Sequence, residues 1–281
     1  MVWPNHALVI SGVADLRAAP DERSELVDQA HFGENTRVLG ALGSWRYVQG
    51  PDQYLGWIRA EVISELSVYG RQRVVARLLA DLHEHPDPTS PVLDQIPAGT
   101  VIPETRYSIQ EGASYRSIPG PDYGGWLEVQ LAAGGGRKPG YIAPDDVVDV
   151  RGLPHRPPIP DDLIRTARAF LGVPYLWGGT TARGLDCSGF VQQVYRLNGV
   201  ALPRDADQQA MLGTRVDDAQ AGDLLFFGAD AVTHVAIATG PREFLHAPMK
   251  GGVVGPGQVG GDRQPRLIRR YLRRLTEAET A

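Results

Sequence analysis

The 281-residue chain contains one cysteine, which excludes an intramolecular disulfide and a cysteine-based metal cage. A reducing compartment is expected on that ground. The formal net charge is -5, so the chain lacks the basic field of a nucleic-acid-binding protein. No apolar run approaches the roughly 18 residues of a membrane helix, and the start, MVWPNHALVISGVADLR, does not resemble a signal peptide. We expect a cytoplasmic protein that binds neither nucleic acid nor membranes.

The residues that are plentiful are those of a globular protein with many turns. Hydrophobic residues make up 42% of the chain and charged residues 22%, and there are 33 glycines and 22 prolines. The length suggests two or three domains with at least one sizeable core.

An internal repeat occupies the first half of the chain. ADLRAAPDERSELVDQAHFGE, from Ala14, and ADLHEHPDPTSPVLDQIPAGT, from Ala80, agree at nine positions at a constant offset of 66. After an insertion the match resumes with WRYVQ against WLEVQ and GWI against GYI. Short strands broken by Pro, Asp and Gly turns predict two small β-barrels, over residues 1–66 and 67–152. The alternation in VLGALGSWRYVQ and YLGWI resembles bacterial SH3-like domains, which serve as spacers or as ligand contacts.

The second half of the chain has a different residue pattern from the first half. Residues 153–160, LPHRPPIP, predict a proline-rich linker, and residues 161–281 predict a separate domain. Its first helix, DDLIRTARAFLG, has Asp161 as candidate N-cap, and a second helix, CSGFVQQVYRLNG, follows. A third short helix is expected near Asp205, and then the strands DLLFFG, HVAIATG and EFLHA. Helices followed by a run of strands predict an α+β fold with an antiparallel sheet.

Cys187 is the first candidate for chemistry, because it opens the second helix directly after a candidate cap, Asp186. The positive end of a helix favours the nucleophilic thiolate, and a nearby imidazole would complete a thiolate–imidazolium pair. His234 and His246 lie on successive predicted strands, where antiparallel pairing could bring a base and its orienting partner side by side. The alternative is a buried structural cysteine with structural or exposed histidines.

Four blocks, DCSGF, LPR, GDLLFF and HVAI, occur together and in order, with PYLWGG before them and FLHAP after them, over about residues 161–275. This set resembles the NlpC family of papain-like cell-wall cysteine peptidases. The resemblance implies that Cys187 is the nucleophile, His234 the base and His246 the orienting residue. It also implies that Tyr175 helps to bind the oxyanion. Tyr175 and Trp177, a further candidate substrate contact, could instead pack in the core.

The resemblance also implies a substrate. The family cleaves the γ-D-glutamyl bond to a diamino acid such as diaminopimelate or lysine. Arg204 and Ser188 would then hold the α-carboxylate of D-Glu, although Arg204 could instead form a surface ion pair. In relatives that act on short recycled peptides, acidic residues and a tyrosine recognise the free amine of L-Ala. Here the matching candidates are Asp186, Glu34 and Tyr54.

The sequence therefore predicts a papain-like cysteine peptidase domain preceded by two SH3-like barrels. It would release L-Ala-γ-D-Glu from peptidoglycan stem peptides with a free N-terminal L-Ala, as part of cell-wall recycling. No cofactor or metal is implied. The alternatives are a secreted murein endopeptidase or lysin whose barrels bind the wall, and a non-catalytic peptidoglycan-binding module.

Overall fold

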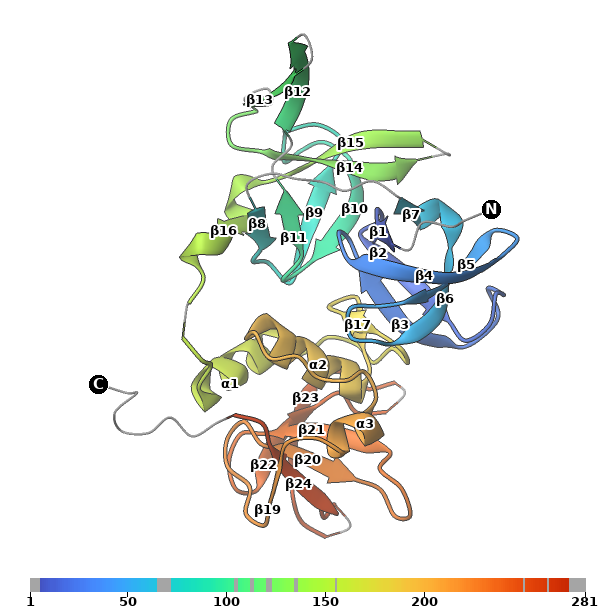
Figure 1. The fold of residues 1–281 in the computed structure, drawn as a ribbon. Coiled ribbons are helices and arrows are strands. Elements are labelled where there is room, and N and C mark those ends of the chain that lie inside the picture. The colour runs from blue at the N-terminus through green and yellow to red at the C-terminus, as the bar shows by residue number, and fades with distance from the viewer. Residues whose placement is uncertain are drawn as a thin grey trace. The chain divides into compact units, whose positions relative to one another are not determined.

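The computed structural model describes residues 6–64, 72–103, 106–111, 114–119, 123–133, 136–154, 156–249, 251–261 and 263–272. The chain forms two compact units, Met1–His155 and Arg156–Ala281 (Figure 1). The division falls inside the predicted proline-rich linker.

The first half of the first unit is a single antiparallel sheet of seven strands, in the order β3-β2-β6-β5-β4-β1-β7. Its core consists of small and branched side chains on the inward face of the alternating strands: Val9, Ala14, Leu16, Ala30, Val48 and Ile58. The strands are β1 (His6–Val9), β2 (Val13–Arg17), β3 (Leu26–His31), β4 (Asn35–Leu42), β5 (Trp45–Gln49), β6 (Leu55–Arg59) and β7 (Ile63–Ser64), with a short 3-10 turn, η1 (Ala60–Val62), before β7.

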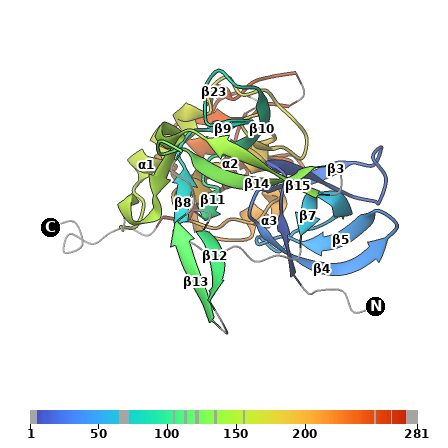
Figure 2. The ribbon, with the colours of Figure 1, turned by 90° about the horizontal axis from the view of Figure 1, so that it is seen from above.

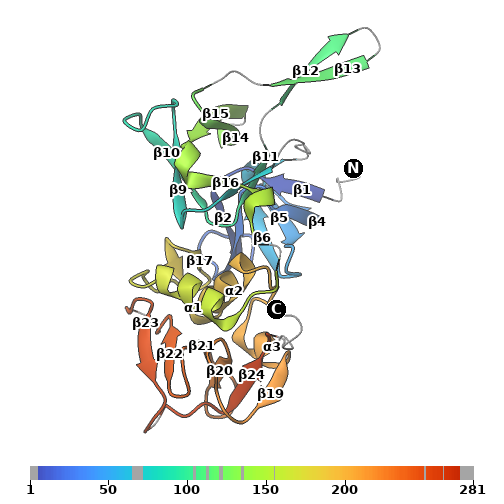
Figure 3. The ribbon, with the colours of Figure 1, turned by 90° about the vertical axis from the view of Figure 1, so that its left-hand side faces the viewer.

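The second half of the unit repeats this plan with two small sheets, ordered β10-β9-β15-β14 and β11-β8-β16. The insertion between the two matching stretches forms its own hairpin, β12–β13, which projects from the rest (Figures 2 and 3). The elements are β8 (Gln72–Val75), β9 (Leu79–His83), β10 (Val92–Pro97), β11 (Val101–Pro103), β12 (Arg106–Glu111), β13 (Ser114–Pro119), β14 (Leu127–Ala133), β15 (Gly136–Ile142), η2 (Pro144–Asp146), β16 (Val147–Asp149) and η3 (Val150–Gly152).

The repeat is preserved in hydrogen bonds as well as in sequence. β9 and β10 have the bounds of β2 and β3 shifted by 66 residues. The Gln29 side chain donates to Asp15 across 3.1 Å, and Gln95 donates to Asp81 across 2.9 Å. The same cross-strand bond thus recurs at equivalent positions.

The second unit is α+β, as predicted. Its six-stranded antiparallel sheet has the order β19-β24-β20-β21-β22-β23, and α1 and α2 lie together on one side of it (Figures 1 and 3). The elements are α1 (Pro160–Ala169), β17 (Thr180–Thr181), β18 (Gly184–Leu185), α2 (Cys187–Leu197), α3 (Ala206–Ala210), β19 (Thr214–Val216), β20 (Leu224–Phe227), β21 (His234–Ala238), β22 (Glu243–His246), β23 (Gly255–Gln258) and β24 (Leu267–Arg270).

The start of α1 corrects one expectation. Asp161 is not the N-cap, because the helix begins one residue earlier, at Pro160, and its N-cap is Ile159. Proline is favoured at the first helical position, where its missing N–H would have no helical partner. The Asp162 carboxylate accepts the N–H of Ile159 across 3.0 Å and so satisfies the helix end from inside.

Among the described residues, none of the helices has both the length and the apolar character needed to cross a membrane.

Candidate active site

Cys187 is the first residue of α2, and the predicted cap is confirmed. The Asp186 side chain accepts the backbone N–H of Gly189 across 2.6 Å, as an N-cap residue does. Gly189 must be glycine, because a Cβ there would lie 2.2 Å from the carbonyl oxygen of Gly179. The DCSG sequence therefore fixes the helix start tightly against the loop that precedes it, and with it the backbone of Cys187.

The thiol of Cys187 lies beside the first residues of β21. The backbone N–H groups of Val235 and Ser188 act to lower the pKa of the thiol, so the cysteine is next to the strand that His234 opens. Burial raises the pKa of the thiol to about 11, and the negative charge of Asp186 adds to the rise. In the substrate-free site, the neutral thiol is therefore favoured over the thiolate that the helix position alone suggests.

His234 and His246 face each other, as the strand pairing predicted. β21 and β22 run antiparallel, and Nε2 of His234 lies 2.8 Å from Nδ1 of His246. One of the two nitrogens must carry the hydrogen. If Nε2 of His234 donates it, Nδ1 of His234 is left as a proton acceptor and His246 is the partner that holds the ring in place.

Two phenyl rings lie beside the histidine pair. Phe227 stacks near His234 with ring centroids 5.9 Å apart, and Phe244 near His246 at 5.1 Å. Burial lowers the pKa of each histidine to about 4, and the positive charge of Arg263 contributes to both shifts. Both rings are therefore neutral near pH 7, which is the state in which His234 can accept a proton.

Tyr175 and Trp177 belong to the segment before the cysteine. The backbone N–H of Tyr175 donates to the carbonyl of Gly252 across 2.9 Å, which anchors the segment. Burial raises the pKa of the Tyr175 phenol to about 12, and interaction with Cys187 adds to the rise, so the phenol is near the thiol and stays a donor. Trp177 is 60% exposed, which rules out the alternative of a core residue for this side chain.

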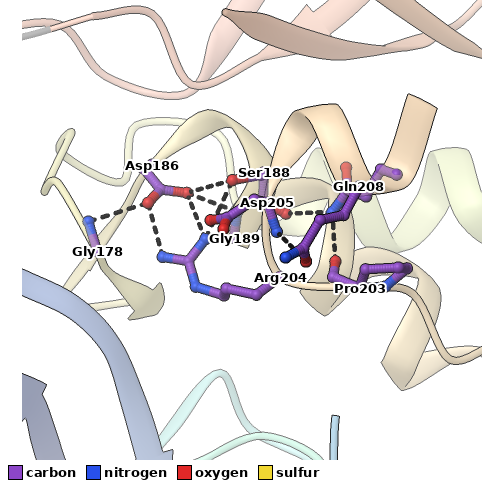
Figure 4. Close-up of polar contacts among 9 residues, drawn as sticks. Gly178, Asp186, Ser188, Gly189, Pro203, Arg204, Asp205 and Gln208 are labelled. Carbon is purple, nitrogen blue, oxygen red and sulfur yellow. Dashed lines mark hydrogen bonds and ion pairs between the residues drawn. The ribbon is translucent and has the colours of Figure 1, made fainter. Parts of the chain in front are cut away.

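Arg204 is buried and paired with Asp186 (Figure 4). Its Nη1 and Nη2 donate to the two carboxylate oxygens across 3.0 and 2.6 Å, and Nη1 also donates to Oγ of Ser188 across 3.0 Å. Its side chain is 1% exposed, so the ion pair is a buried one and not the surface pair considered as an alternative. The predicted contact with a substrate carboxylate stays a prediction.

The Asp186 carboxylate is fully engaged by the protein. Besides the two bonds from Arg204, it accepts the N–H groups of Gly178 and Gly189 and the hydroxyl of Ser188. Five donors on one carboxylate tie the preceding loop, the helix start and Arg204 into one network. A substrate amine at Asp186 would have to share these oxygens with those donors.

Glu34 and Tyr54 belong to the first unit. Glu34 follows β3, and its Oε2 accepts the backbone N–H of His31 across 3.0 Å. Tyr54 precedes β6 and is half-buried, and its backbone N–H donates to the Asp52 side chain across 3.0 Å. Their predicted role in recognising a substrate amine stays a prediction.

Arg263 is a neighbour of the site that sequence reasoning missed. It lies between β23 and β24, outside every block of the family resemblance, and only its charge near two histidines marks it. Within the part of the chain that the structure describes, no cluster of His, Cys, Asp and Glu could hold a metal ion.

Comparisons with known proteins agree with this geometry. Residues 172–269 match the model of the NlpC/P60 family, and residues 16–63 match the bacterial dipeptidyl-peptidase SH3 domain. Dipeptidyl-peptidase 6 of Lysinibacillus sphaericus is 28% identical in an alignment of 279 positions that covers 95% of this chain and 96% of that protein. The match with the gamma-D-glutamyl-L-lysine dipeptidyl-peptidase of Bacillus subtilis is 47% identical over 97 residues, 32% of this chain and 33% of that relative.

A solved structure shares the fold. The crystal structure of an NlpC/P60 family protein from Bacillus cereus superposes with a TM-score of 0.75 and covers 95% of this chain and 100% of the other. The sequence identity of the pair is 23%, so the likeness concerns the fold.

Proposed function

We propose that this chain, a cysteine peptidase with an NlpC/P60 family domain at residues 172–269, hydrolyses the γ-D-glutamyl bond to a diamino acid in peptidoglycan stem peptides. The observation that carries the proposal is the arrangement at the start of α2. A helix-capping aspartate precedes Cys187, and the strand beside its thiol begins with a histidine bonded to a second histidine across 2.8 Å. The name of the B. subtilis relative, a gamma-D-glutamyl-L-lysine dipeptidyl-peptidase, supports this choice of substrate, and that of the L. sphaericus relative, a dipeptidyl-peptidase, supports release of a dipeptide.

The Cys187 thiol and the His234 ring are both neutral before acylation, so the thiol proton is transferred to the ring during the attack. The Cys187 sulfur attacks the γ-carbonyl carbon of D-Glu, while its proton passes to Nδ1 of His234. The C–N bond to the diamino acid then breaks, and His234 returns that proton to the leaving nitrogen. The products of this step are a thioester on Cys187 and the free amine of the diamino acid.

Deacylation uses the same base. His234 takes a proton from water, the hydroxide oxygen bonds to the thioester carbon, and the C–S bond breaks. The cysteine leaves as a thiolate and recovers the proton from His234. The net change is the addition of one water across the amide bond, which requires no cofactor.

Each tetrahedral intermediate places a negative charge on the former carbonyl oxygen. Tyr175 is suited to stabilise it, because its raised pKa of about 12 keeps the phenol protonated and able to donate. The backbone N–H groups at the start of α2 add the positive end of the helix to the same region.

The preference for a free N-terminal amine is the finer part of the proposal. The Asp186 carboxylate already accepts five hydrogen bonds, so a substrate amine there would share its oxygens with those donors, and Glu34 is the second acidic candidate. Selection of free amines would restrict the enzyme to peptides released from the glycan chain. Such peptides are recycled inside the cell, and we therefore place the enzyme in cytoplasmic recycling.

Two peptides test the proposal directly. L-Ala-γ-D-Glu-meso-diaminopimelate and its N-acetylated form are incubated with the native protein and with Cys187→Ala, and the products are weighed by mass spectrometry. The lysine peptides are run in parallel. We expect release of L-Ala-γ-D-Glu from the free peptides only, and no release by Cys187→Ala.

The other outcomes separate the alternatives. Equal cleavage of free and acetylated peptides would retain the peptidase and discard the amine preference, which favours a wall endopeptidase. A native protein that cleaves none of the four peptides would overturn the proposed substrate. Glu34→Gln, compared with Glu84→Gln in the second barrel as a matched control, tests whether the preference depends on Glu34.

A further inference from the structure

The segment between β23 and β24 connects an edge strand of the sheet to a strand that lies between β19 and β20. Val259 and Ile268, near its two ends, pack against a cluster that includes Ala236 and Ala238 of β21. Side chains alternate along a strand, so His234 lies on the same face as Ala236 and Ala238. Val259 and Ile268 therefore lie on the face of the sheet that carries the histidine pair.

Arg263 lies within this segment and is held in a turn. Its backbone N–H donates to the carbonyl of Gly260 across 3.0 Å, and the N–H of Gly260 donates back across 3.2 Å. Three residues later, the N–H of Arg266 donates to the carbonyl of Phe226 across 2.9 Å, next to the pair formed by Phe227 and His234. Three residues span at most about 10 Å, so Arg263 lies close to the first residue of β21.

The Arg263 guanidinium is exposed, and it acts on the site by charge. Its positive charge lowers the pKa of both His234 and His246. Among the described residues, its side chain forms no hydrogen bond or ion pair, in contrast to Arg266, which donates to the carbonyl of Ala229 across 2.8 Å. Nothing in the described fold uses this cation, which leaves it available for an anion from outside.

The leaving group of the proposed reaction is the diamino acid, and its α-carboxylate is a suitable anion. His234 gives its proton to the nitrogen that departs, so the diamino acid must sit on the histidine side of the site. That nitrogen is bonded to the α-carbon of the diamino acid, and the α-carboxylate is attached to the same carbon. A carboxylate two bonds from the leaving nitrogen therefore comes to the region of Arg263.

We propose that Arg263 binds the α-carboxylate of the diamino acid, so that the enzyme prefers tripeptides that end at this residue over longer peptides. This inference rests on the proposed function. In a longer stem peptide the same carboxyl group is an amide, which carries no charge and gives no charge-assisted bond to a guanidinium. When the substrate binds, its carboxylate lies next to the positive charge of Arg263, beside the histidine pair.

The test compares L-Ala-γ-D-Glu-L-Lys with its lysine α-carboxamide, and the diaminopimelate peptide with its matching carboxamide. kcat and KM are measured for the native protein, Arg263→Ala and Arg242→Ala. Arg242, an exposed arginine in the turn at the opposite end of β21 and β22, is the matched control. Arg263→Gln provides a second variant of similar size if the alanine variant folds poorly.

We expect the native protein to prefer the free carboxylate by ~10- to 100-fold in kcat/KM, as for a charged hydrogen bond. Arg263→Ala should lose this preference through a higher KM for the carboxylate peptides, with the carboxamide constants unchanged. Arg242→Ala should behave like the native protein. In Arg263→Ala the acid limb of the pH profile should also move to higher pH, because a cation near His234 is gone.

Four results would overturn the inference. A preference that survives in Arg263→Ala would show that another group reads the carboxylate. An equal loss on both kinds of peptide would make Arg263 a residue that acts only through the histidines. A native protein that cleaves neither kind of peptide would remove the proposed function and this inference with it, whereas cleavage of both kinds without a preference removes only this inference.

Discussion

Two polar clusters flank Cys187, and they are built on opposite principles. On the helix side, Asp186 and Arg204 carry opposite charges, and the carboxylate accepts five hydrogen bonds. On the strand side, His234 and His246 share one hydrogen bond of 2.8 Å, and the rings of Phe227 and Phe244 lie beside them. The first cluster holds fixed charges, and the second holds neutral rings.

The difference follows from what each cluster does. A buried charge is tolerated only when it is paired and hydrogen-bonded, and such a group then changes its protonation state with difficulty. A base must gain and lose a proton in every catalytic cycle, so few partners and an apolar setting suit it better. We infer that the Asp186–Arg204 pair fixes the position of Cys187, whereas the histidine pair moves the proton.

Replacing either histidine should lower the catalytic activity and change the stability of the fold only slightly. His234→Ala removes the base, and a fall of ~10²- to 10⁴-fold in kcat is expected. His246→Ala should cost less, and His246→Asn less again, because a side-chain carbonyl can still accept the hydrogen of His234 Nε2. Peptide hydrolysis measures the activity, and urea unfolding of the same variants should show a small change.

An equal loss of activity in His246→Ala and His246→Asn would contradict this account, since it would mean that accepting the hydrogen from His234 is not the task of His246.

Replacing the carboxylate of the ion pair should break the fold as well as the site. Asp186→Asn leaves the guanidinium of Arg204, 1% exposed, without its counter-charge, and the free energy of unfolding should fall by about 3–5 kcal/mol. Urea unfolding of the second unit measures this loss.

Asp162→Asn is the matched control. Asp162 also satisfies a helix N-terminus and pairs with arginines, but Arg156 and Arg165 are 50% and 74% exposed. Exposed pairs contribute at most about 1 kcal/mol and a lost cap about 1 kcal/mol more. If the two variants lost the same stability, burial of Arg204 would not be the cause and the comparison between the clusters would fail.

Much of this site was predictable, because its parts depend on short-range patterns. The cap at Asp186 follows from its place before a helix, and the meeting of His234 and His246 follows from antiparallel strands joined by a short turn. The Asp186–Arg204 pair spans 18 residues of chain, and no local pattern indicates that Arg204 turns toward the cap. Arg263 has no motif, and only the folded segment brings its charge near the histidines.

The two repeats in the first unit show the same limit on prediction. Gly33 and Gly99 both have φ of 75°, so the repeated glycine keeps the turn that requires it. Glu34, however, corresponds to Thr100 and His31 to Pro97, which has no N–H for a carboxylate to accept. The shared residues thus predicted the shared fold, whereas the polar group at this turn differs between the copies.

The protonation state of Cys187, which lies between the two clusters, can be tested separately. Because the pKa of the thiol is raised to about 11, the thiolate fraction is small at neutral pH and grows about tenfold per pH unit below that value. The rate of alkylation by iodoacetamide, a neutral reagent, should therefore rise steadily from pH 6 to 10. A rate that is already constant between pH 5 and 8 would show a preformed thiolate–imidazolium pair instead.

The most direct test of the central claim is to trap the acyl-enzyme. The native protein is mixed with L-Ala-γ-D-Glu-L-Lys or its diaminopimelate analogue, quenched in acid within milliseconds to seconds, and examined by intact and peptide mass spectrometry. The account predicts a transient L-Ala-γ-D-Glu acyl group on Cys187, and none on Cys187→Ala. Peptide cleavage that persists in Cys187→Ala, or an acyl group on another residue, would contradict it.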